Sequence, residues 1–185
     1  LLKRNAEVFR SIIDPVTSSG FNGIFLVATN PVDIMTYVFT KISGLPENQI
    51  MGSGTILDTA RLRYGLSEHF KVAQGNIHAY VFGEHGDTSF IPWTGAYISG
   101  LSTDEYYEEM KAHGKDVKPL DKEAMLEYVQ KSGGKVIAKK GATFYAVSSS
   151  VCKLCSLLVS SSESVSTVST MMHGEYGIED VCLST

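Results

Sequence analysis

Cysteine, long apolar runs and glycosylation sequons are scarce or absent in this sequence. Three cysteines in 185 residues are few and odd in number, which is typical of a reducing compartment and argues against a disulfide-stabilised secreted protein. No apolar run approaches the roughly 20 residues that a membrane-spanning helix needs. The first residues show no signal-peptide pattern. Together these absences predict a cytoplasmic location.

The sequence also lacks a strong excess of either charge. The net charge is −4 with both signs interspersed, so there is no basic footprint for nucleic acid. Hydrophobic residues make up 43%, which suits a globular core and argues against disorder. The chain begins without Met inside a helical pattern and ends inside a strand pattern, so we expect it to be a piece of a longer protein.

The first 50 residues alternate between helical and strand patterns. Apolar residues recur with a helical period over 1–19, where the late Pro15 predicts a kink or an early end. The apolar run 24–28 has the length of a strand buried on both faces, as in parallel sheets. The segment after Pro31 is again helical and ends at Gly44. This succession predicts an α/β fold.

Asn30 stands between the first strand and the second helix. One interpretation makes it the helix N-cap, with Pro31 as the first helical residue. The other places its amide beside a ligand, because the carboxyl ends of parallel strands are where open α/β proteins bind their ligands. The local sequence alone favours the cap.

A further helix is predicted from Leu57 onward. Asp58 and Arg61 are three positions apart and share one face, whereas Arg63 lies about 200° round from Arg61. Asp58 and Arg61 can form an exposed ion pair, which is a common and weak feature. Alternatively, they belong to a functional site while Arg63 serves another surface.

Segment 78–88 resembles a buried strand that runs into a polar turn. Residues 80–82 favour a strand and Gly83 ends it. His85 in the turn is a candidate general acid or base, because the pKa of histidine lies near neutrality. The other interpretation is a solvated surface histidine.

Two further patterns are weaker. Cys152 and Cys155 form one CxxC inside a helical pattern with no second pair, so we interpret them as small buried core residues. His78, His85 and Asp87 could ligate a metal in a hydrolase, although their spacing matches no standard zinc motif.

Five motifs, in order along the chain, resemble the NAD-dependent L-lactate dehydrogenase family. They are Val27-Ala28-Thr29-Asn30-Pro31-Val32-Asp33, Gly52-Ser53-Gly54-Thr55-x-Leu57-Asp58-Thr59-Ala60-Arg61-x-Arg63, Gly83-Glu84-His85-Gly86-Asp87-Thr88, Lys140-Gly141-Ala142-Thr143 and Gly174-Glu175-Tyr176-Gly177. The resemblance implies that 1–51 are the end of a Rossmann-type NAD-binding domain and that 52–185 are most of an α+β substrate domain. The family's N-terminal third, with its glycine fingerprint and mobile loop, has no counterpart in this sequence.

The resemblance implies a catalytic role for several side chains. His85 corresponds to the proton donor to the substrate carbonyl, and Asp58 to the carboxylate that favours its imidazolium form. Arg61 corresponds to the residue that grips the substrate carboxylate, a task for which a guanidinium fork is well suited. The implied reaction is the reversible reduction of pyruvate to L-lactate with NADH in glycolytic fermentation.

Three more residues are implied around the cofactor and the substrate. Asn30 corresponds to a residue beside the nicotinamide of NAD and the reacting carbonyl, and its bond to Pro31 is expected to be cis. Ser53 corresponds to a nicotinamide contact and Thr143 to the wall of the substrate pocket. The hydride chemistry itself belongs to the nicotinamide.

Arg63 and His78 match the positions that bind fructose 1,6-bisphosphate between subunits of the allosteric bacterial enzymes. The resemblance therefore implies activation by this sugar bisphosphate in a homotetramer, in which cations from two subunits surround the phosphates.

The sequence is also compatible with other functions. A lactate-like malate dehydrogenase or a branched hydroxyacid enzyme fits many of the same motifs. A truncated, non-catalytic product is a further alternative. The serine-rich run 148–169 departs from the family, where alanine and leucine are commoner, and so does His173 before Gly174.

Overall fold

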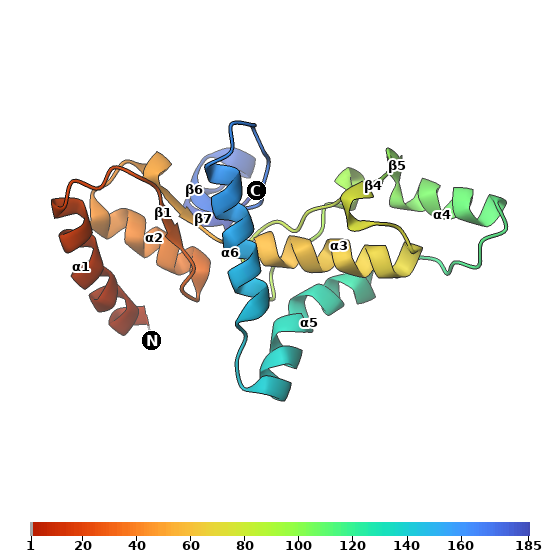
Figure 1. Ribbon diagram of the computed structural model, residues 1–185, viewed down its shortest axis with the longest axis horizontal. Helices are drawn as coiled ribbons and strands as arrows, with labels where there is room; N and C mark the ends of the chain where they lie inside the picture. Colours follow the sequence, from red (N-terminus) through yellow and green to blue (C-terminus); the bar gives the residue numbers. More distant parts are fainter. Residues whose placement is uncertain (1) are drawn as a thin grey trace.

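The computed structural model of the chain describes residues 2–185. In chain order the helices and strands are α1 (Leu2–Ser18), β1 (Phe25–Val27), α2 (Val32–Ser43), β2 (Ile50–Gly52), α3 (Ile56–Phe70), β3 (Ile77–His78), β4 (Tyr97–Ile98), β5 (Leu101–Ser102), α4 (Thr103–Ala112), α5 (Lys122–Lys140), α6 (Tyr145–Leu158), β6 (Ser169–His173) and β7 (Glu179–Ser184). They form two lobes, and α6 crosses between them (Figure 1).

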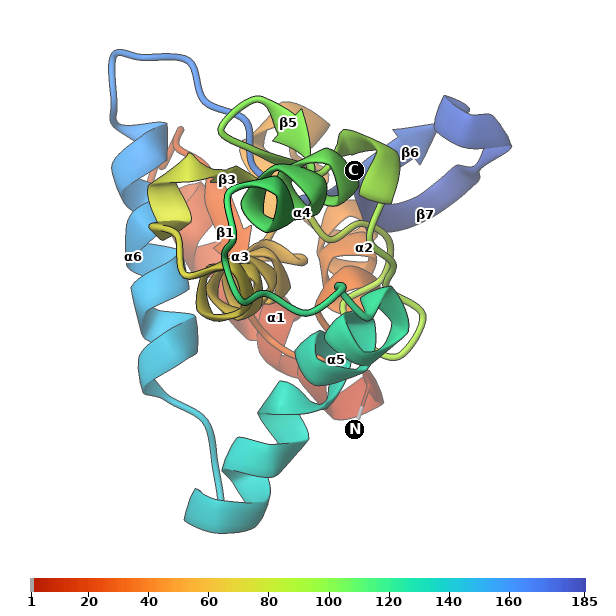
Figure 2. The same cartoon turned by 90° about the vertical axis from the view of Figure 1, so that its right-hand side faces the viewer.

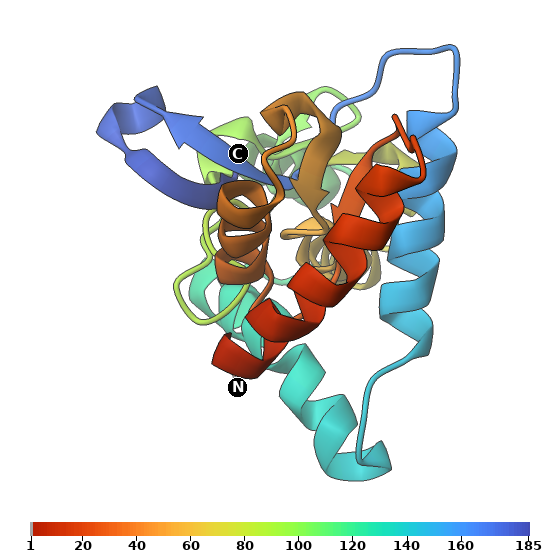
Figure 3. The same ribbon diagram turned by 90° about the vertical axis from the view of Figure 1, so that its left-hand side faces the viewer.

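The first lobe is built on a sheet with the strand order β1-β2-β6-β7. β1 and β2 are parallel, with Phe25 opposite Ile50, whereas β6 runs antiparallel to both of its neighbours. α1 and α2 lie side by side (Figure 3) and share one apolar core with β1 and β2. The core residues are Phe9, Ile13, Val27, Met35, Phe39 and Ile50. The α/β fold predicted from the sequence is confirmed.

Gly52 at the end of β2 permits a close approach of α2 to this sheet. A Cβ at this position would lie 2.2 Å from Oγ1 of Thr36 on α2 and 2.9 Å from Cβ of Ser169 on β6. Only a hydrogen fits in this gap, so the glycine allows the helix and both strands to meet at one point.

The second lobe surrounds α3. A three-stranded antiparallel sheet, β3-β4-β5, packs with α3, α4 and α5 around the residues Leu62, Leu66, Phe70, Ile77, Val81, Ile98 and Val129. Figure 2 shows α3 nearly end-on between α5 and α6. Because only three residues separate β2 from α3, the first turn of α3 lies at the boundary between the lobes.

The structure corrects two boundaries predicted from the sequence. α1 does not stop at Pro15 but continues to Ser18, because Phe9 and Ile13 anchor its buried face and the proline lies in the last turn. Asn30 is not the N-cap of α2. That position belongs to Pro31, and the helix begins at Val32. The Asn30–Pro31 peptide bond is cis, as expected.

The predicted strand at 80–82 is not a regular strand. β3 ends at His78, and the chain then crosses from the second sheet to the first. Phe82 forms an isolated bridge with Phe90, and Gly83 forms one with Ser184 at the end of β7. Segment 79–83 therefore links the two lobes, because its backbone pairs with partners outside β3.

Local capping residues set both ends of α5. The side chain of Asp121 caps it by accepting a hydrogen bond from the Ala124 N–H at 2.9 Å, and Gly141 ends it in the left-handed region. The helix runs through Gly133 and Gly134, although each glycine costs a helix interior roughly 1 kcal/mol relative to alanine.

Cys152 and Cys155 are exposed, so their interpretation as buried core residues is wrong. Leu154 is the buried residue of α6, and the two cysteines flank it on the outward side of the helix. None of the helices among residues 2–185 has both the length and the apolar character needed to cross a membrane.

Candidate active site

Hydrogen bonds from Thr55 and Thr59 fix the N-terminal end of α3 to its neighbours. The Thr55 hydroxyl donates to the Val81 carbonyl oxygen at 2.5 Å, and the Thr55 N–H donates to the Ser184 hydroxyl at 3.0 Å. In the next turn, Thr59 Oγ1 accepts a hydrogen bond from the Val81 N–H at 2.9 Å. α3 is thereby fixed to segment 79–83 and to β7, and this holds Asp58 at the boundary of the lobes.

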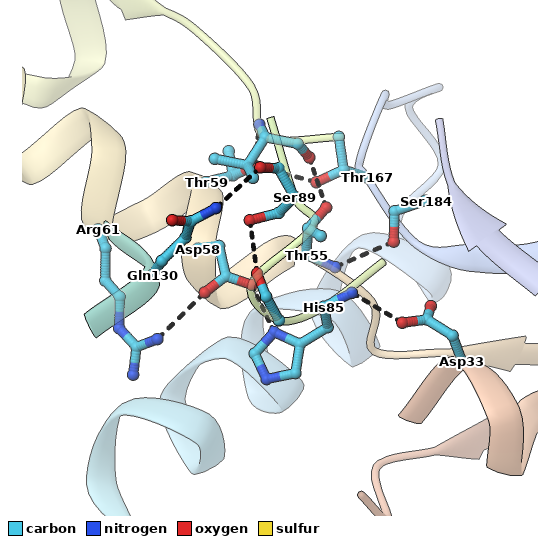
Figure 4. Close-up of polar contacts among 12 residues, drawn as sticks. Asp33, Thr55, Asp58, Thr59, Arg61, His85, Ser89, Gln130, Thr167 and Ser184 are labelled. Atoms are coloured by element: carbon cyan, nitrogen blue, oxygen red, sulfur yellow. Dashed lines mark hydrogen bonds and ion pairs between the residues drawn. The ribbon is translucent and has the colours of Figure 1, made fainter. Parts of the chain in front are cut away.

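Asp58 and His85 form a close pair at this boundary. Nδ1 of His85 lies 2.5 Å from Oδ2 of Asp58, and the carboxylate is almost entirely buried (Figure 4). This hydrogen bond raises the pKa of His85 above its usual value, against the opposing effect of burial. The ring is therefore held in one orientation, and its protonated form is favoured. The interpretation of His85 as a free surface histidine is wrong.

The side chain of Asp33 binds the backbone of the same histidine. Its Oδ2 accepts a hydrogen bond from the His85 N–H at 2.7 Å (Figure 4). Burial raises the pKa of Asp33, and Oδ1 has no hydrogen-bond partner among the described residues, nor does the nearby Ser169 hydroxyl. The sequence analysis missed this contact, because the two residues are 52 positions apart.

Arg61 is the second partner of Asp58. Its Nη1 lies 3.1 Å from Oδ1 of Asp58, and its side chain is only 15% exposed. The pair predicted from the three-residue spacing is thus formed, and it is not an exposed ion pair. The two oxygens of Asp58 serve different partners, so one carboxylate orients both an imidazole and a guanidinium (Figure 4).

These groups face a cavity of about 360 Å³. Asn30 and Thr143 line it together with His85 and Arg61, and its remaining walls come from Ala28, Leu57, Asp58, Gly86, Gln130, Gly133, Gly134, Ile137 and Val147. Ser53 lines an adjoining cavity of about 40 Å³ that shares Asn30 and His85. The structure therefore brings together all the residues predicted for the catalytic, substrate and nicotinamide positions.

Gln130 on α5 supports the loop that carries His85. Its side-chain amide donates to the carbonyl oxygens of Asp87 and Ser89, at 3.0 Å each. The sequence analysis missed this residue, because a glutamine in a polar helix gives no signal that its partners lie more than 40 positions away.

Arg63 and His78 lie outside this cavity. Nε of Arg63 donates to the Ala79 carbonyl oxygen at 3.0 Å, and the guanidinium lies 4.7 Å from the centre of the Tyr80 ring. His78 is exposed on β3. Arg63 is thus turned away from Arg61, as the helical period predicts, and it lies next to the strand that carries His78.

The proposed metal ligands do not come together. Residues 2–185 contain no group of three or more His, Cys, Asp or Glu side chains arranged to hold a metal ion. The alternative of a hydrolase with a metal on His78, His85 and Asp87 has no support in this part of the chain.

Both parts of the chain match models of one protein family. Residues 55–185 match the family model of the lactate/malate dehydrogenase α/β C-terminal domain, and residues 1–52 match that of the NAD binding domain of the same family. The chain belongs to the lactate/malate dehydrogenase family. The resemblance found in the sequence motifs is thereby confirmed.

The chain is also similar to individual L-lactate dehydrogenases of this family. The chain is 46% identical to an L-lactate dehydrogenase of Acetivibrio thermocellus over 184 residues, which are 100% of this chain and 57% of that protein. It is 46% identical to an L-lactate dehydrogenase of Bacillus pumilus over 181 residues, 98% and 56% of the two chains. The chain thus spans a little over half the length of these curated relatives.

Solved structures of dehydrogenases share the fold. A lactate dehydrogenase from a Medee basin deep-sea metagenome superposes with a TM-score of 0.92 at 36% identity, covering 100% of this chain and 58% of that one. An L-lactate dehydrogenase of Clostridium thermocellum gives a TM-score of 0.88 at 37% identity and covers 100% and 59%.

Proposed function

We propose that this protein acts as an L-lactate dehydrogenase, which reduces pyruvate to L-lactate with NADH and catalyses the reverse reaction with NAD⁺. The observation that carries the proposal is the arrangement of His85 and Arg61 around one buried carboxylate, Asp58, on the wall of one cavity. A proton donor and a carboxylate-binding group, fixed relative to each other, are what a 2-oxo acid requires for reduction.

Arg61 binds the substrate carboxylate in this proposal. One guanidinium nitrogen, Nη1, is engaged with Asp58, so Nη2 and the remaining N–H groups are free to form charge-assisted hydrogen bonds to the substrate. The partial burial of Arg61 strengthens these bonds, because water competes less for them.

His85 supplies the proton. With Nδ1 directed at Asp58, Nε2 remains to donate to the carbonyl oxygen of the substrate. The raised pKa of His85, caused mainly by its hydrogen bond to Asp58, favours the form that carries this proton. When bound, NADH supplies the hydride to the carbonyl carbon. The carbonyl thus becomes the hydroxyl of lactate, and His85 is left neutral until it takes up a proton again.

The residues around the cavity fit the nicotinamide end of NAD. Asn30 and Ser53 offer an amide and a hydroxyl, and Leu57, Val147 and Val151 offer apolar surface. In this proposal Asn30 holds the carboxamide or the reacting carbonyl, Ser53 contacts the nicotinamide, and Thr143 forms the wall of the substrate pocket. Residues 1–51 would then belong to the NAD-binding domain, and 52–185 to the substrate domain.

The direct test is NADH oxidation by the natural gene product in the presence of pyruvate, followed by absorbance. We expect His85→Asn to reduce kcat by roughly 10²- to 10⁴-fold, the usual contribution of a general acid. His113→Asn is the matched control, since His113 is exposed at the C-terminal end of α4. Equal rates for the unmodified protein and His85→Asn would refute the proposed mechanism.

The substrate class is tested in the same assay. Malate dehydrogenase and a branched hydroxyacid dehydrogenase are the alternative functions, so oxaloacetate and a branched 2-oxo acid are compared with pyruvate. A clear preference for oxaloacetate would assign the protein to the malate branch. If no 2-oxo acid is reduced, the alternative of a truncated, non-catalytic product is favoured.

Regulation by fructose 1,6-bisphosphate is part of the proposal. Arg63 and His78 would bind its phosphates between subunits of a homotetramer, in a cytoplasmic enzyme of glycolytic fermentation. We expect saturating fructose 1,6-bisphosphate to lower the KM for pyruvate, and Arg63→Gln to remove this response. Arg10→Gln on the exposed side of α1 is the control. Kinetics that do not change with the bisphosphate would rule out this regulation.

A further inference from the structure

A serine interrupts the apolar inner face of α6, the helix that crosses between the lobes (Figure 1). Val147 is half-buried and Leu154 is buried, and Ser150 lies on their side of the helix, three positions after the first and four before the second. Ser148 and Ser149 are exposed, whereas Ser150 is half-buried. Serine is less favourable than alanine in a helix interior, so the stability of α6 does not account for a hydroxyl at this position.

The hydroxyl of Ser150 does not bond back to its own helix. Ser148 shows the usual arrangement of a serine within a helix, because its Oγ donates to the Phe144 carbonyl oxygen one turn earlier at 2.8 Å. Ser132 on α5 does the same toward Tyr128. Within residues 2–185, no side-chain hydrogen bond of this kind is formed by Ser150. Its hydroxyl is therefore available to a bound molecule.

This hydroxyl belongs to the lining of a small cavity. Ser150 lines the space of about 40 Å³ that adjoins the substrate cavity, and the other polar side chains of this lining are Asn30, Ser53 and His85. Ser53 comes from the end of β2, where its N–H donates to the Val27 carbonyl oxygen at 2.8 Å. A single water needs roughly 10–15 Å³ by this measure, so the cavity has room for a group of about three heavy atoms.

A carboxamide matches this cavity in size and in hydrogen-bonding groups. It has three heavy atoms, of which the oxygen accepts and the nitrogen donates, and a serine hydroxyl can do both. Ser53 and Ser150 lie on different elements of the fold, so two hydroxyls are offered to one small planar group. Leu57 and Val147 border this cavity and the larger one alike, and they provide apolar surface for an attached ring. These features fit the carboxamide end of a nicotinamide.

We propose that Ser150 is a cofactor-binding residue, whose hydroxyl forms a hydrogen bond with the carboxamide of the nicotinamide alongside Ser53. The inference rests on the proposed function, because it takes the larger cavity as the place where the nicotinamide ring meets the substrate. It adds a polar contact from α6. The serine-rich run that begins at Ser148 departs from the dehydrogenase family, so this contact is a property of the present chain.

The experiment measures NADH binding to the natural gene product by calorimetry, without substrate. Ser150→Ala removes the hydroxyl and favours the helix, so the fold is retained. We expect the affinity for NADH to fall roughly 2- to 12-fold, the range for one neutral hydrogen bond. The affinity for ADP-ribose, which lacks the nicotinamide, should not change. Ser148→Ala is the matched control, because Ser148 lies on the same helix, is exposed and bonds to its own backbone.

The comparison of the two ligands separates a cofactor contact from a structural role. An unchanged affinity of Ser150→Ala for NADH would overturn the inference. An equal loss of affinity for NADH and for ADP-ribose would also overturn it, because the substitution would then act on the whole site. Reduction of pyruvate by the unmodified protein would leave the proposed function intact in both cases. If the unmodified protein binds neither ligand, the proposed function fails first and the inference falls with it.

Discussion

Asp33 accepts a hydrogen bond from the backbone N–H of His85 at 2.7 Å, although the two residues are 52 positions apart. The contact joins the first turn of α2 to the loop after segment 79–83, and so it connects the two lobes at the catalytic histidine of the proposed reaction. Asp58 holds the ring of the same residue. His85 is thus positioned through its backbone by one carboxylate and through its side chain by another.

Replacing Asp33 tests the backbone contact. Asp33→Asn keeps an oxygen acceptor for the His85 N–H and adds an amide donor near the unpartnered Ser169 hydroxyl. We expect the fold to persist and the pKa of His85 to fall, because the charge of Asp33 contributes to raising it. NMR titration of the ring is the measurement, and Asp14→Asn on the exposed side of α1 is the control.

The same variant changes the pH dependence of stability. The folded-state pKa of Asp33 is raised above 3.8, so the folded protein holds this proton more tightly than the unfolded chain does. Asp33 therefore stabilises the folded protein at low pH. This stabilisation is lost as the pH rises from 3.8 through the folded-state pKa of Asp33. Asp33→Asn should remove this loss in urea titrations. A curve that matches the unmodified protein would contradict the burial argument.

Replacing Asp58 tests the pair that sets the charge of His85. In Asp58→Asn the geometry is retained but the negative partner is lost, so the pKa of His85 should fall toward or below 6.5. We expect kcat for pyruvate near neutral pH to drop by up to roughly 10²-fold, because a smaller fraction of His85 then carries the proton that the general acid must donate. The control is Asp116→Asn, at an exposed position before α5.

Stability gives an independent readout of the His85–Asp58 pair. The folded-state pKa of His85 is raised above 6.5, so the pair stabilises the fold fully below pH 6.5 and less as the pH rises through the folded pKa. This decline should be absent in Asp58→Asn. If the variant shows the same decline, another group titrates in this range.

Arg61→Lys tests whether the guanidinium group binds the substrate carboxylate. Lysine keeps the charge but loses the planar fork, so one hydrogen bond to Asp58 or to the substrate is lost. A hydrogen bond to a charged group contributes about 1.5–3 kcal/mol, and we expect KM for pyruvate to rise roughly 10- to 150-fold by the same estimate. Steady-state kinetics measure this effect, and Arg10→Lys serves as the control. An unchanged KM would place the substrate carboxylate elsewhere.

Thr55→Val tests the hydrogen bond from the Thr55 hydroxyl to the Val81 carbonyl at the start of α3. Valine has the shape of threonine but leaves the buried Val81 carbonyl without its hydroxyl donor. We expect a loss of about 1–3 kcal/mol in the free energy of unfolding, the usual penalty for an unpaired buried polar group. Urea denaturation measures it, and Thr94→Val at an exposed position should change stability by less than about 0.5 kcal/mol. An equal loss of stability in both variants would contradict a stabilising role for this hydrogen bond.

The sequence by itself determined what depends on neighbours a few residues away. The ends of α5 follow from Asp121 and Gly141, and the i,i+3 spacing on a helix brought Asp58 and Arg61 together and turned Arg63 away. The apolar run 24–28 predicted β1, which pairs in parallel with β2. Motifs of the dehydrogenase family then indicated which strand ends would meet.

Only the tertiary structure decided which long-range partners these residues would have. Asp33 and Gln130 hold the His85 loop from positions more than 40 residues away, and no local pattern encodes such a pairing. The segment 79–83 leaves its sheet because its backbone pairs with Phe90 and Ser184 instead. Cys152 and Cys155 are exposed because α6 buries Leu154, and the choice of buried face depends on where α3 lies. Burial and long-range hydrogen bonds are properties of the packed molecule, so they become visible only when the two lobes are in place.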